Sequence, residues 1–257
     1  MRCSAVVLAG GSGRRMGSDK AKQYMEIGGF PVLYYSLKAF QDSFIDEIIL
    51  VTGSGHCGNA GSDGASPEDE ALYCRREVVE RYGFDKVKAI VSGGKERYHS
   101  AAAGLMAVSA DTDYVFIHDA ARPCVSREVL DRALETVVEY GTAIVSVPSK
   151  DTVKLADKDG FVTATPARDS VYIMQTPQVF AFGAIKKAYE ELIENEEALI
   201  GEGVSITDDA MVMERFGRLP IKLCPGDYRN IKLTTPEDIR VAEGYLQEEL
   251  YRGFAGF

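Results

Sequence analysis

The sequence is short of positive charge. Its 257 residues include 39 acidic and 29 basic ones, which gives a formal net charge of -10 at pH 7. Nonspecific binding to nucleic acids or to anionic membranes requires a basic field, so we expect neither partner. A small phosphorylated ligand fits this composition only if a local group of cations meets its charge.

Cysteine is scarce and scattered. The five cysteines form no C-x-x-C pair and are odd in number, which provides no zinc or disulfide framework and is typical of a reducing compartment. Long hydrophobic runs are also lacking. The apolar run at 5–9 is far too short for a signal-sequence core or a membrane span, so the expected location is the cytoplasm.

Histidine is the third shortage, with His56, His99 and His118 as the only examples. No Ser-His-Asp or Cys-His arrangement can be argued from these three. His118 is expected at the end of a strand, where a lone histidine serves either in acid–base catalysis or, more often, in structure.

What the sequence does contain is an alternation of short β-branched runs with helical patterns. The runs predict strands at 4–9, 48–51, 89–91, 114–117 and 143–147, and helices at 32–40, 71–82, 100–108 and 127–140. This alternation is typical of an α/β fold with a mostly parallel sheet covered on both faces. Residues 1–257 are expected to form a single domain.

Two segments interrupt the alternation. Residues 53–67 are rich in Gly, Ser and Asp and are expected to be an exposed insertion. Residues 148–176 lack a helical period and contain two short runs, 151–155 and 161–163, on either side of an Asp157–Gly160 turn. This pattern predicts a β-hairpin, and we interpret it as a projecting arm used in dimerisation.

A glycine-rich loop with four cations follows the first expected strand. It reads Gly10-Gly-Ser-Gly-Arg-Arg-Met-Gly17, with Lys20 and Lys22 just beyond. A glycine turn after a strand exposes backbone N–H groups that bind anions. The spacing matches neither the dinucleotide fingerprint nor the P-loop. A turn with solvated charges is the simpler alternative, but the preceding strand and the density of cations favour a polyphosphate site.

The fourth expected strand ends in His118-Asp-Ala-Ala-Arg-Pro123. Ligands of open α/β sheets lie beyond the carboxyl ends of the strands, so Asp119 and Arg122 are expected near the glycine loop. Asp119 would there hold Mg²⁺ on a triphosphate. The alternative is that Asp119 caps the next helix.

Further polar residues stand beside apolar runs. Gly93-Gly-Lys-Glu-Arg97 with Ser100 opens a helix of small residues, where a flat ring can approach the backbone. The other polar clusters are Arg168, Thr176-Pro-Gln178, Thr207-Asp-Asp209 and Arg229-Asn-Ile-Lys232. Taken singly, each of these clusters is best explained as a solvated face.

Taken together, the chain resembles the 2-C-methyl-D-erythritol 4-phosphate cytidylyltransferases of the non-mevalonate isoprenoid pathway. The resemblance runs in order through Ala9–Met16 with Lys22-Gln-Tyr24, Gly93–Arg97 with Ser100, His118–Pro123, Asp151–Lys154, Thr176–Phe180, Thr207-Asp208, and Asn230–Lys232 with Pro236–Asp238. The first motif is shared widely among nucleotidyltransferases, whereas the combination is specific. It implies a three-layer α/β/α, Rossmann-like nucleotidyltransferase fold with a projecting β-hairpin arm.

The resemblance also implies roles for individual residues. Arg15 and Lys22 would stabilise charge on the reacting phosphates, while Arg168 and Lys232 would position the sugar-alcohol phosphate. Arg122, Thr152 and Thr176 would lie near that phosphate. CTP would be framed by Ala9, Gly10, Gly11, Gly13, Gly94 and Ser100, with Asp119 helping to hold Mg²⁺. In the family the arm reaches a twofold-related subunit, so a homodimer is expected in which Thr152 and Arg168 serve the partner's site.

Other functions stay open at this point. The chain could transfer a cytidylyl group to ribitol 5-phosphate, act on a sugar 1-phosphate with UTP or dTTP, or bind a nucleotide as a regulator without turnover. The His118–Pro123 motif favours the methylerythritol branch. Lys95 departs from the family, which often has an acidic residue there, and the insertion at 53–67 has no obvious counterpart.

Overall fold

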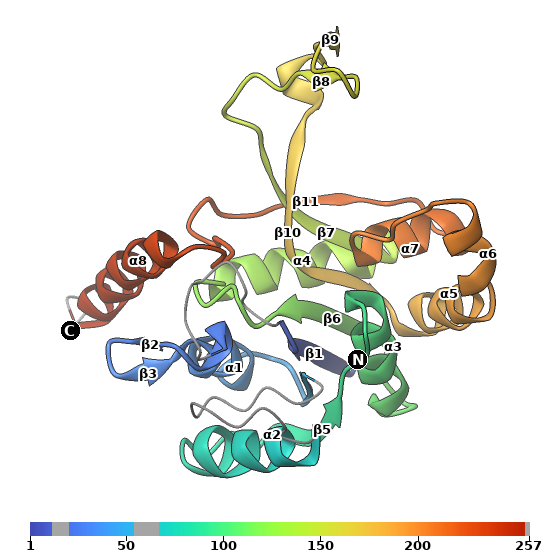
Figure 1. Cartoon of the computed structure of the whole chain (residues 1–257). Coiled ribbons are helices and arrows are strands. Elements are labelled where there is room, and N and C mark those ends of the chain that lie inside the picture. Colours follow the sequence, from blue (N-terminus) through green and yellow to red (C-terminus); the bar gives the residue numbers. More distant parts are fainter. Residues whose placement is uncertain (12–20, 54–66, 255–257) are drawn as a thin grey trace.

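The computed structural model describes residues 1–11, 21–53 and 67–254, and its centre is a mostly parallel sheet (Figure 1). Within these ranges the central sheet has seven strands in the order β11-β7-β10-β6-β1-β4-β5. Their bounds are β1 Cys3–Ala9, β4 Glu47–Thr52, β5 Val87–Ser92, β6 Tyr114–Asp119, β7 Thr142–Pro148, β10 Tyr172–Ala181 and β11 Leu223–Pro225. Only β10 runs antiparallel to its neighbours in this sheet.

Helices cover both faces of the sheet, because the strands are apolar on both sides. Ala5 and Val7 of β1 pack in one core with α1, α2 and α4, whereas Val6 and Leu8 pack in a second core with α3, α5 and α7. The helix bounds are α1 Val32–Gln41, α2 Pro67–Cys74, α3 Arg97–Ala107, α4 Arg127–Tyr140, α5 Phe182–Glu194, α6 Glu196–Gly201 and α7 Asp209–Phe216. The three-layer α/β/α prediction is therefore confirmed.

The helix α4 shows how the sequence sets these elements. Val129, Leu130, Ala133 and Val137 are buried and recur at the spacing of one helix face. The helix ends at Gly141, whose φ of 76° is left-handed and favours glycine at this position. The predicted bounds, 127–140, match the observed ones.

A smaller substructure adjoins the amino-terminal half of the chain. It contains the short helix η2 (Lys22–Tyr24), the two-stranded sheet of β2 (Glu26–Ile27) and β3 (Phe30–Pro31), and the carboxyl-terminal helix α8 (Pro236–Phe254). A third apolar cluster joins β2 to α8 through Ile27, Ala242 and Leu246. This packing brings the segment after β11 back towards Lys22.

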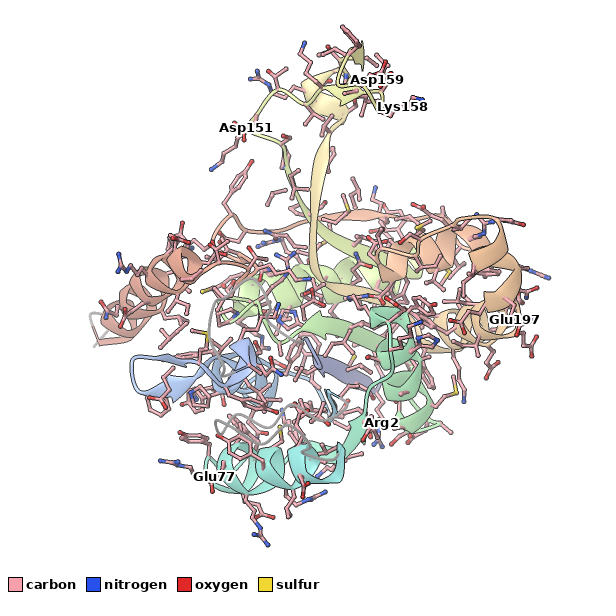
Figure 2. The ribbon with its side chains drawn as sticks, viewed as in Figure 1. Arg2, Glu77, Asp151, Lys158, Asp159 and Glu197 are labelled. Carbon is pink, nitrogen blue, oxygen red and sulfur yellow. The ribbon has the colours of Figure 1, made fainter. Side chains whose placement is uncertain are left out.

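The arm leaves the body between β7 and β10 (Figure 1). It contains β8 (Leu155–Ala156), β9 (Val162–Ala164) and η4 (Arg168–Ser170). The Asp157 carboxylate accepts hydrogen bonds from the backbone N–H groups of Asp159 and Phe161, which closes the predicted turn. Asp151, Lys158 and Asp159 lie on this projection, with Lys158 and Asp159 near its tip and Asp151 closer to the main body (Figure 2).

The arm is shorter than predicted, and β10 is missing from the sequence-based assignment. The expected arm runs to residue 176, but Tyr172, Ile173 and Met174 already pair with β7. The polar residues of this segment and its Pro177 argue against a strand when only the sequence is known. The peptide bond before Pro177 is cis. Gln175, Thr176 and Gln178 are buried in β10 and have hydrogen-bond partners, so polarity here does not mark a loop.

Three further expectations can be compared with the structure. The insertion expected at 53–67 lies almost wholly outside the described residues. Cys3 and Cys224 are buried, free thiols, as expected for cysteines that provide no disulfide framework. No helix among the described residues is both long and apolar enough to cross a bilayer.

Candidate active site

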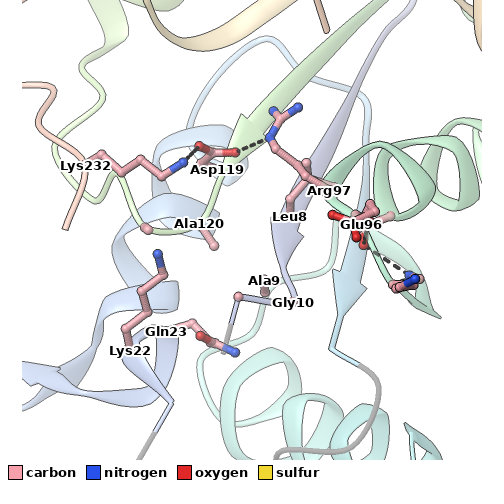
Figure 3. A pocket seen from close by; sticks show the side chains of 15 residues that line it. Leu8, Ala9, Gly10, Lys22, Gln23, Glu96, Arg97, Asp119, Ala120 and Lys232 are labelled. Atoms are coloured by element: carbon pink, nitrogen blue, oxygen red, sulfur yellow. Dashed lines mark hydrogen bonds and ion pairs between the residues drawn. The ribbon is translucent and has the colours of Figure 1, made fainter. Parts of the chain in front are cut away.

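A pocket of about 520 Å³ opens at the carboxyl ends of β1 and β6. The end of β1 supplies Leu8–Gly11, the β6 end supplies Asp119–Ala121, and the start of α3 closes another side (Figure 3). The remaining lining residues are Lys22, Gln23, Gly94, Lys95, Glu96, Arg97, Ser100 and Lys232. The site therefore occupies the place where open α/β sheets bind ligands.

The carboxylate of Asp119 is the centre of this pocket. One oxygen accepts a hydrogen bond of 3.2 Å from Nε of Arg97, and the other accepts one of 2.6 Å from Nζ of Lys232. Burial alone would raise the pKa of Asp119, but the charges of Arg97 and Lys232 outweigh it and hold that pKa well below its usual range. Asp119 is thus a fixed anion held between two cations.

Arg97 is held from behind by a second carboxylate. Its Nη1 and Nη2 atoms each donate a hydrogen bond of 2.8 Å to Asp209, the first residue of α7. Asp209 is fully buried and also accepts a hydrogen bond of 2.6 Å from the Tyr189 hydroxyl. The Arg97 guanidinium therefore joins a pocket carboxylate to a core carboxylate.

His118 supports the β6 end from inside the protein. Its Nδ1 lies 3.0 Å from Oγ1 of Thr176, and its Nε2 lies 3.1 Å from the carbonyl oxygen of Arg122. The Arg122 carbonyl oxygen can only accept, so Nε2 carries the proton and Nδ1 accepts from the Thr176 hydroxyl, whose oxygen also accepts from the Asp119 N–H. Burial lowers the pKa of His118 to about 4. The histidine is a neutral structural residue.

The opposite wall is formed by Lys22 and the start of the glycine loop. The Lys22 ammonium extends into the same cavity as Asp119 (Figure 3) and lies 3.5 Å from the carbonyl oxygen of Leu233. A Cβ atom at Gly11 would approach Cε of Lys22 to 3.2 Å. Glycine therefore leaves this lysine room beside the backbone that follows β1.

The third wall is the turn before α3. The Gly94 N–H donates to Oγ of Ser100 at 3.2 Å, and a Cβ atom at Gly94 would overlap the side chain of His99. Glu96 and His99 form a capping box that fixes the start of α3. A narrow, backbone-lined wall of this kind suits the predicted approach of a flat ring.

The structure brings together many of the predicted site residues. Those lining the pocket are Ala9, Gly10, Gly11, Lys22, Gly94, Ser100, Asp119 and Lys232. Gly13 and Arg15 lie outside the described residues. Asp119 does not cap a helix, because it ends β6 and Ser126 occupies the N-cap position of α4.

Four predicted substrate residues do not line this pocket. Arg122 and Thr176 lie behind it, where Arg122 donates to the carbonyl oxygens of Asn230 and Met174. Arg168 and Thr152 lie on the exposed arm, joined to each other by a hydrogen bond of 3.0 Å. Within one chain, the two predicted phosphate-positioning residues, Arg168 and Lys232, are thus in different regions.

The sequence assigned no role in the pocket to Arg97, Glu96 or Gln23, and none to Asp209, which holds Arg97. The position of Arg97 at the start of a helix after a strand was the available signal. The interpretation of the clusters at 176–178, 207–209 and 229–232 as solvated faces is wrong for several of their members. The buried ones are Thr176, Gln178, Asp209 and Asn230, each of which has polar partners inside the protein.

The pocket has carboxylates that could ligate a divalent cation. No group of three or more metal-ligating His, Cys, Asp or Glu side chains occurs among the described residues. Mg²⁺ in nucleotide enzymes needs only one or two carboxylates, since phosphates and water complete its shell. Each Asp119 oxygen accepts a hydrogen bond from one cation and has a second lone pair. The Asp119 carboxylate therefore fits Mg²⁺ that arrives with a nucleotide.

Comparison with known proteins gives one consistent family. The family model described as IspD, 2-C-methyl-D-erythritol 4-phosphate cytidylyltransferase, matches residues 3–248. A relative of that name from Lachnoclostridium phytofermentans is 43% identical over 247 residues, which cover 96% of this chain and 97% of the relative. Another from Lachnospira eligens is 45% identical over 245 residues, covering 95% and 99%.

Solved structures agree with the sequence relatives. The 4-diphosphocytidyl-2C-methyl-D-erythritol synthase of Anaerococcus prevotii has a TM-score of 0.76 and 34% identity, with 96% of each chain covered. The 2-C-methyl-D-erythritol 4-phosphate cytidylyltransferase of Francisella tularensis has a TM-score of 0.73 and 26% identity, with 95% of this chain and all of that chain covered. The fold and the order of its elements are therefore shared over almost the whole chain.

Proposed function

The chain belongs to the 2-C-methyl-D-erythritol 4-phosphate cytidylyltransferase family, and we propose that its reaction takes place in the pocket around Asp119. It is an enzyme of isoprenoid biosynthesis that transfers the cytidylyl group of CTP to 2-C-methyl-D-erythritol 4-phosphate. The products are 4-diphosphocytidyl-2-C-methyl-D-erythritol and pyrophosphate. The convergence of Lys22, Arg97 and Lys232 on this pocket carries the proposal.

The chemistry explains why the pocket offers cations and no catalytic base. A phosphate monoester has a second pKa of about 6, so its oxygen is already an anionic nucleophile near pH 7. The difficulty is to bring two anionic reactants together. Positioned cations meet this need, as in other phosphoryl and nucleotidyl transfers. The neutral, buried His118 takes no part in proton transfer.

The CTP half of the site is assigned to the glycine loop and the turn before α3. Ala9, Gly10, Gly11, Gly94 and Ser100 would frame the nucleotide, and Gly13 would continue the loop. Lys22 would neutralise charge that develops on the phosphates, which is supported by its position across the pocket from Asp119. Arg15 is assigned the same role from the sequence resemblance alone.

A bound divalent cation would be held by Asp119 and would neutralise charge on the leaving pyrophosphate. Arg97 and Lys232 keep the Asp119 carboxylate ionised and fix its direction. The chain's own contribution is thus one oriented anion, set among cations that would otherwise repel the metal.

The second phosphate would be held by Lys232 and by the arm of a partner subunit. Arg168 and Thr152 are exposed residues of the arm, and neither lines the pocket of its own chain. The arm also exposes three apolar side chains, with Leu155 at 52%, Phe161 at 73% and Val162 at 59%. Such exposure at a tip is typical of a surface that a partner covers. A twofold dimer would carry Arg168 and Thr152 to the partner's pocket, with Arg122 and Thr176 supporting its floor.

The cytoplasm is the proposed location. The free, buried thiols of Cys3 and Cys224 support it, because such cysteines are typical of reducing compartments.

Pyrophosphate release tests the proposed function. The protein would be incubated with CTP, Mg²⁺ and either 2-C-methyl-D-erythritol 4-phosphate or ribitol 5-phosphate. We expect release with the methylerythritol substrate. Release with ribitol 5-phosphate alone would support the other cytidylyl transfer, and release with neither would support a nucleotide-binding regulator. Substituting UTP for CTP in the same assay measures the selectivity for the base.

A further inference from the structure

Asp209 is a fully buried carboxylate that does not touch the pocket. It begins α7 and bonds to the pocket residue Arg97, with hydrogen bonds of 2.8 Å from both Nη atoms. The Tyr189 hydroxyl donates to the same carboxylate at 2.6 Å. Burial disfavours the charge on Arg97, but Asp209 and Asp119 raise the pKa of its guanidinium well above its usual value. Asp209 is therefore the inner anion for a cation of the active site.

The two carboxylates divide the donors of one guanidinium. Asp209 accepts one hydrogen bond from each of Nη1 and Nη2, and Nε is the atom that donates to Asp119. A guanidinium whose Nη atoms were released could turn them towards the nearest carboxylate, because bidentate pairs are the strongest arrangement of these groups. That carboxylate is Asp119, which would then be tied more fully to Arg97.

A purely stabilising role is a poor account of this arrangement. A buried ion pair adds little to stability compared with apolar residues of similar volume, because of the cost of desolvating its charges. The pair instead fixes a direction, since the planar guanidinium is clamped along one edge and has a single bond to the pocket. Asp119 consequently retains its contact with Lys232 at 2.6 Å.

We infer that Asp209 is a positioning residue for cytidylyl transfer, acting through Arg97 to keep Asp119 available to Lys232 and to the incoming nucleotide. The inference rests on the proposed function of the Asp119 pocket. Turnover would then depend on Asp209, a core residue of α7 that lies outside the pocket, as well as on the residues that line the pocket.

The test compares Asp209→Asn with Asp208→Ala. The first substitution keeps the shape of the side chain but removes the charge that clamps Arg97. Asp208 is the adjacent residue, and its carboxylate caps α7 by accepting a hydrogen bond from the Met211 N–H. The same carboxylate also accepts a hydrogen bond from Nε2 of Gln178 in β10. Removing this cap destabilises the same helix end without touching Arg97. Thermal unfolding, pyrophosphate release and CTP binding by calorimetry would be measured for both variants.

We expect Asp209→Asn to lower kcat/KM about 10- to 100-fold, the range typical of groups that orient active-site ligands. CTP binding should weaken as well. Asp208→Ala should lower Tm while kcat/KM stays within about twofold of the parent. Equal loss of activity in the two variants at equal loss of Tm would overturn the inference, as would an unchanged kcat/KM in Asp209→Asn.

A double-mutant cycle with Arg97→Met shows whether Asp209 acts through Arg97. In the Arg97→Met background, Asp209→Asn should change kcat/KM and CTP affinity by less than about twofold. Full additivity of the two effects would overturn the inference. Asp209→Glu, which keeps the charge, should recover part of the activity lost in Asp209→Asn. Absence of turnover in the parent would contradict the proposed function, while the CTP-binding cycle would still decide the role of Asp209.

Discussion

The pocket and the arm hold their cations in opposite ways. Arg97 and Lys232 are fixed by the same Asp119 carboxylate, and Arg97 is clamped a second time by buried Asp209. On the arm, Arg168 is exposed and donates a hydrogen bond to the hydroxyl of Thr152, which is exposed as well. The first region is preorganised within one chain, whereas the second is not.

This difference indicates which parts of the site are complete. Preorganised charges contribute most to catalysis when they need not move during the reaction. Arg97 and Lys232 of the pocket are held in this way by Asp119. An exposed arginine on a projection gains such order only from a surface that covers it. The contrast supports a site that is built by the pocket of one subunit and finished by the arm of another.

The largest effect on kcat is expected from removing a cation of the pocket. Lys22→Ala should lower kcat roughly 100- to 1000-fold, equivalent to about 2.7–4 kcal/mol, because it removes one well-placed donor to the transition state. Steady-state pyrophosphate release measures this change. Lys38→Ala is the matched control, since Lys38 is an exposed cation paired with Asp42 on α1, and its kcat should not change. A near-normal kcat in Lys22→Ala would remove Lys22 from the proposed role.

A smaller effect is expected on the arm. Arg168→Ala should raise KM for the sugar-alcohol phosphate about 10- to 100-fold, in keeping with the ~1.5–3 kcal/mol of a hydrogen bond to a charged group. The effect on kcat should be smaller, as for Lys232→Ala. Lys154, an exposed arm cation that donates to Thr165, gives the control Lys154→Ala with an unchanged KM. An unchanged KM in Arg168→Ala would exclude the arm from substrate binding.

The smallest effect concerns stability against pH. The folded pKa of His118 is about 4, below the value of about 6.5 in an unfolded chain. The unfolded state therefore binds more protons between these values, and stability falls as the pH falls through that window. His118 should account for about 2 kcal/mol of lost unfolding free energy between about pH 7.5 and 5.

Urea unfolding at several pH values tests this assignment. His118→Gln lacks the titrating ring, so its unfolding free energy should depend less on pH in this window. Arg168→Ala changes only the arm and should keep the parent's pH dependence. An identical slope in His118→Gln and the parent would show that other groups cause the acid sensitivity.

The features of the pocket and of the arm that depend on local sequence patterns could be predicted from the sequence. The end of β1 at Ala9 was predicted, and β6 was expected to end at residue 117, two residues before its observed end at Asp119. The apolar runs and the glycine loop mark these ends, which is why the place of the pocket could be predicted. The arm's hairpin was predicted from the Asp157–Gly160 turn. These features need only neighbours along the chain.

The sequence could not predict the contacts that join distant segments. Arg97 and Asp209 are 112 positions apart, and nothing local distinguishes Asp209 from a solvated aspartate. The strand β10 was missed for a related reason, since Thr176 and Gln178 satisfy their polar groups inside the protein with His118 and Asp208. Burial of polar residues depends on partners that only the folded chain brings together.

The most direct test of the account is complementation between two impaired chains, assayed with the sugar-alcohol phosphate well below the KM of Arg168→Ala, where both variants turn over poorly. Lys22→Ala and Arg168→Ala would be co-expressed with different tags, and the mixed dimer would be purified through both tags. If the arm completes the partner's site, one of its sites combines an intact pocket with an intact arm, so the mixed dimer should show about half of the parent activity. A mixed dimer of Lys22→Ala with Asp119→Asn, both in the pocket, should restore nothing. Activity in the first mixed dimer no greater than that of the separate variants would contradict the shared site.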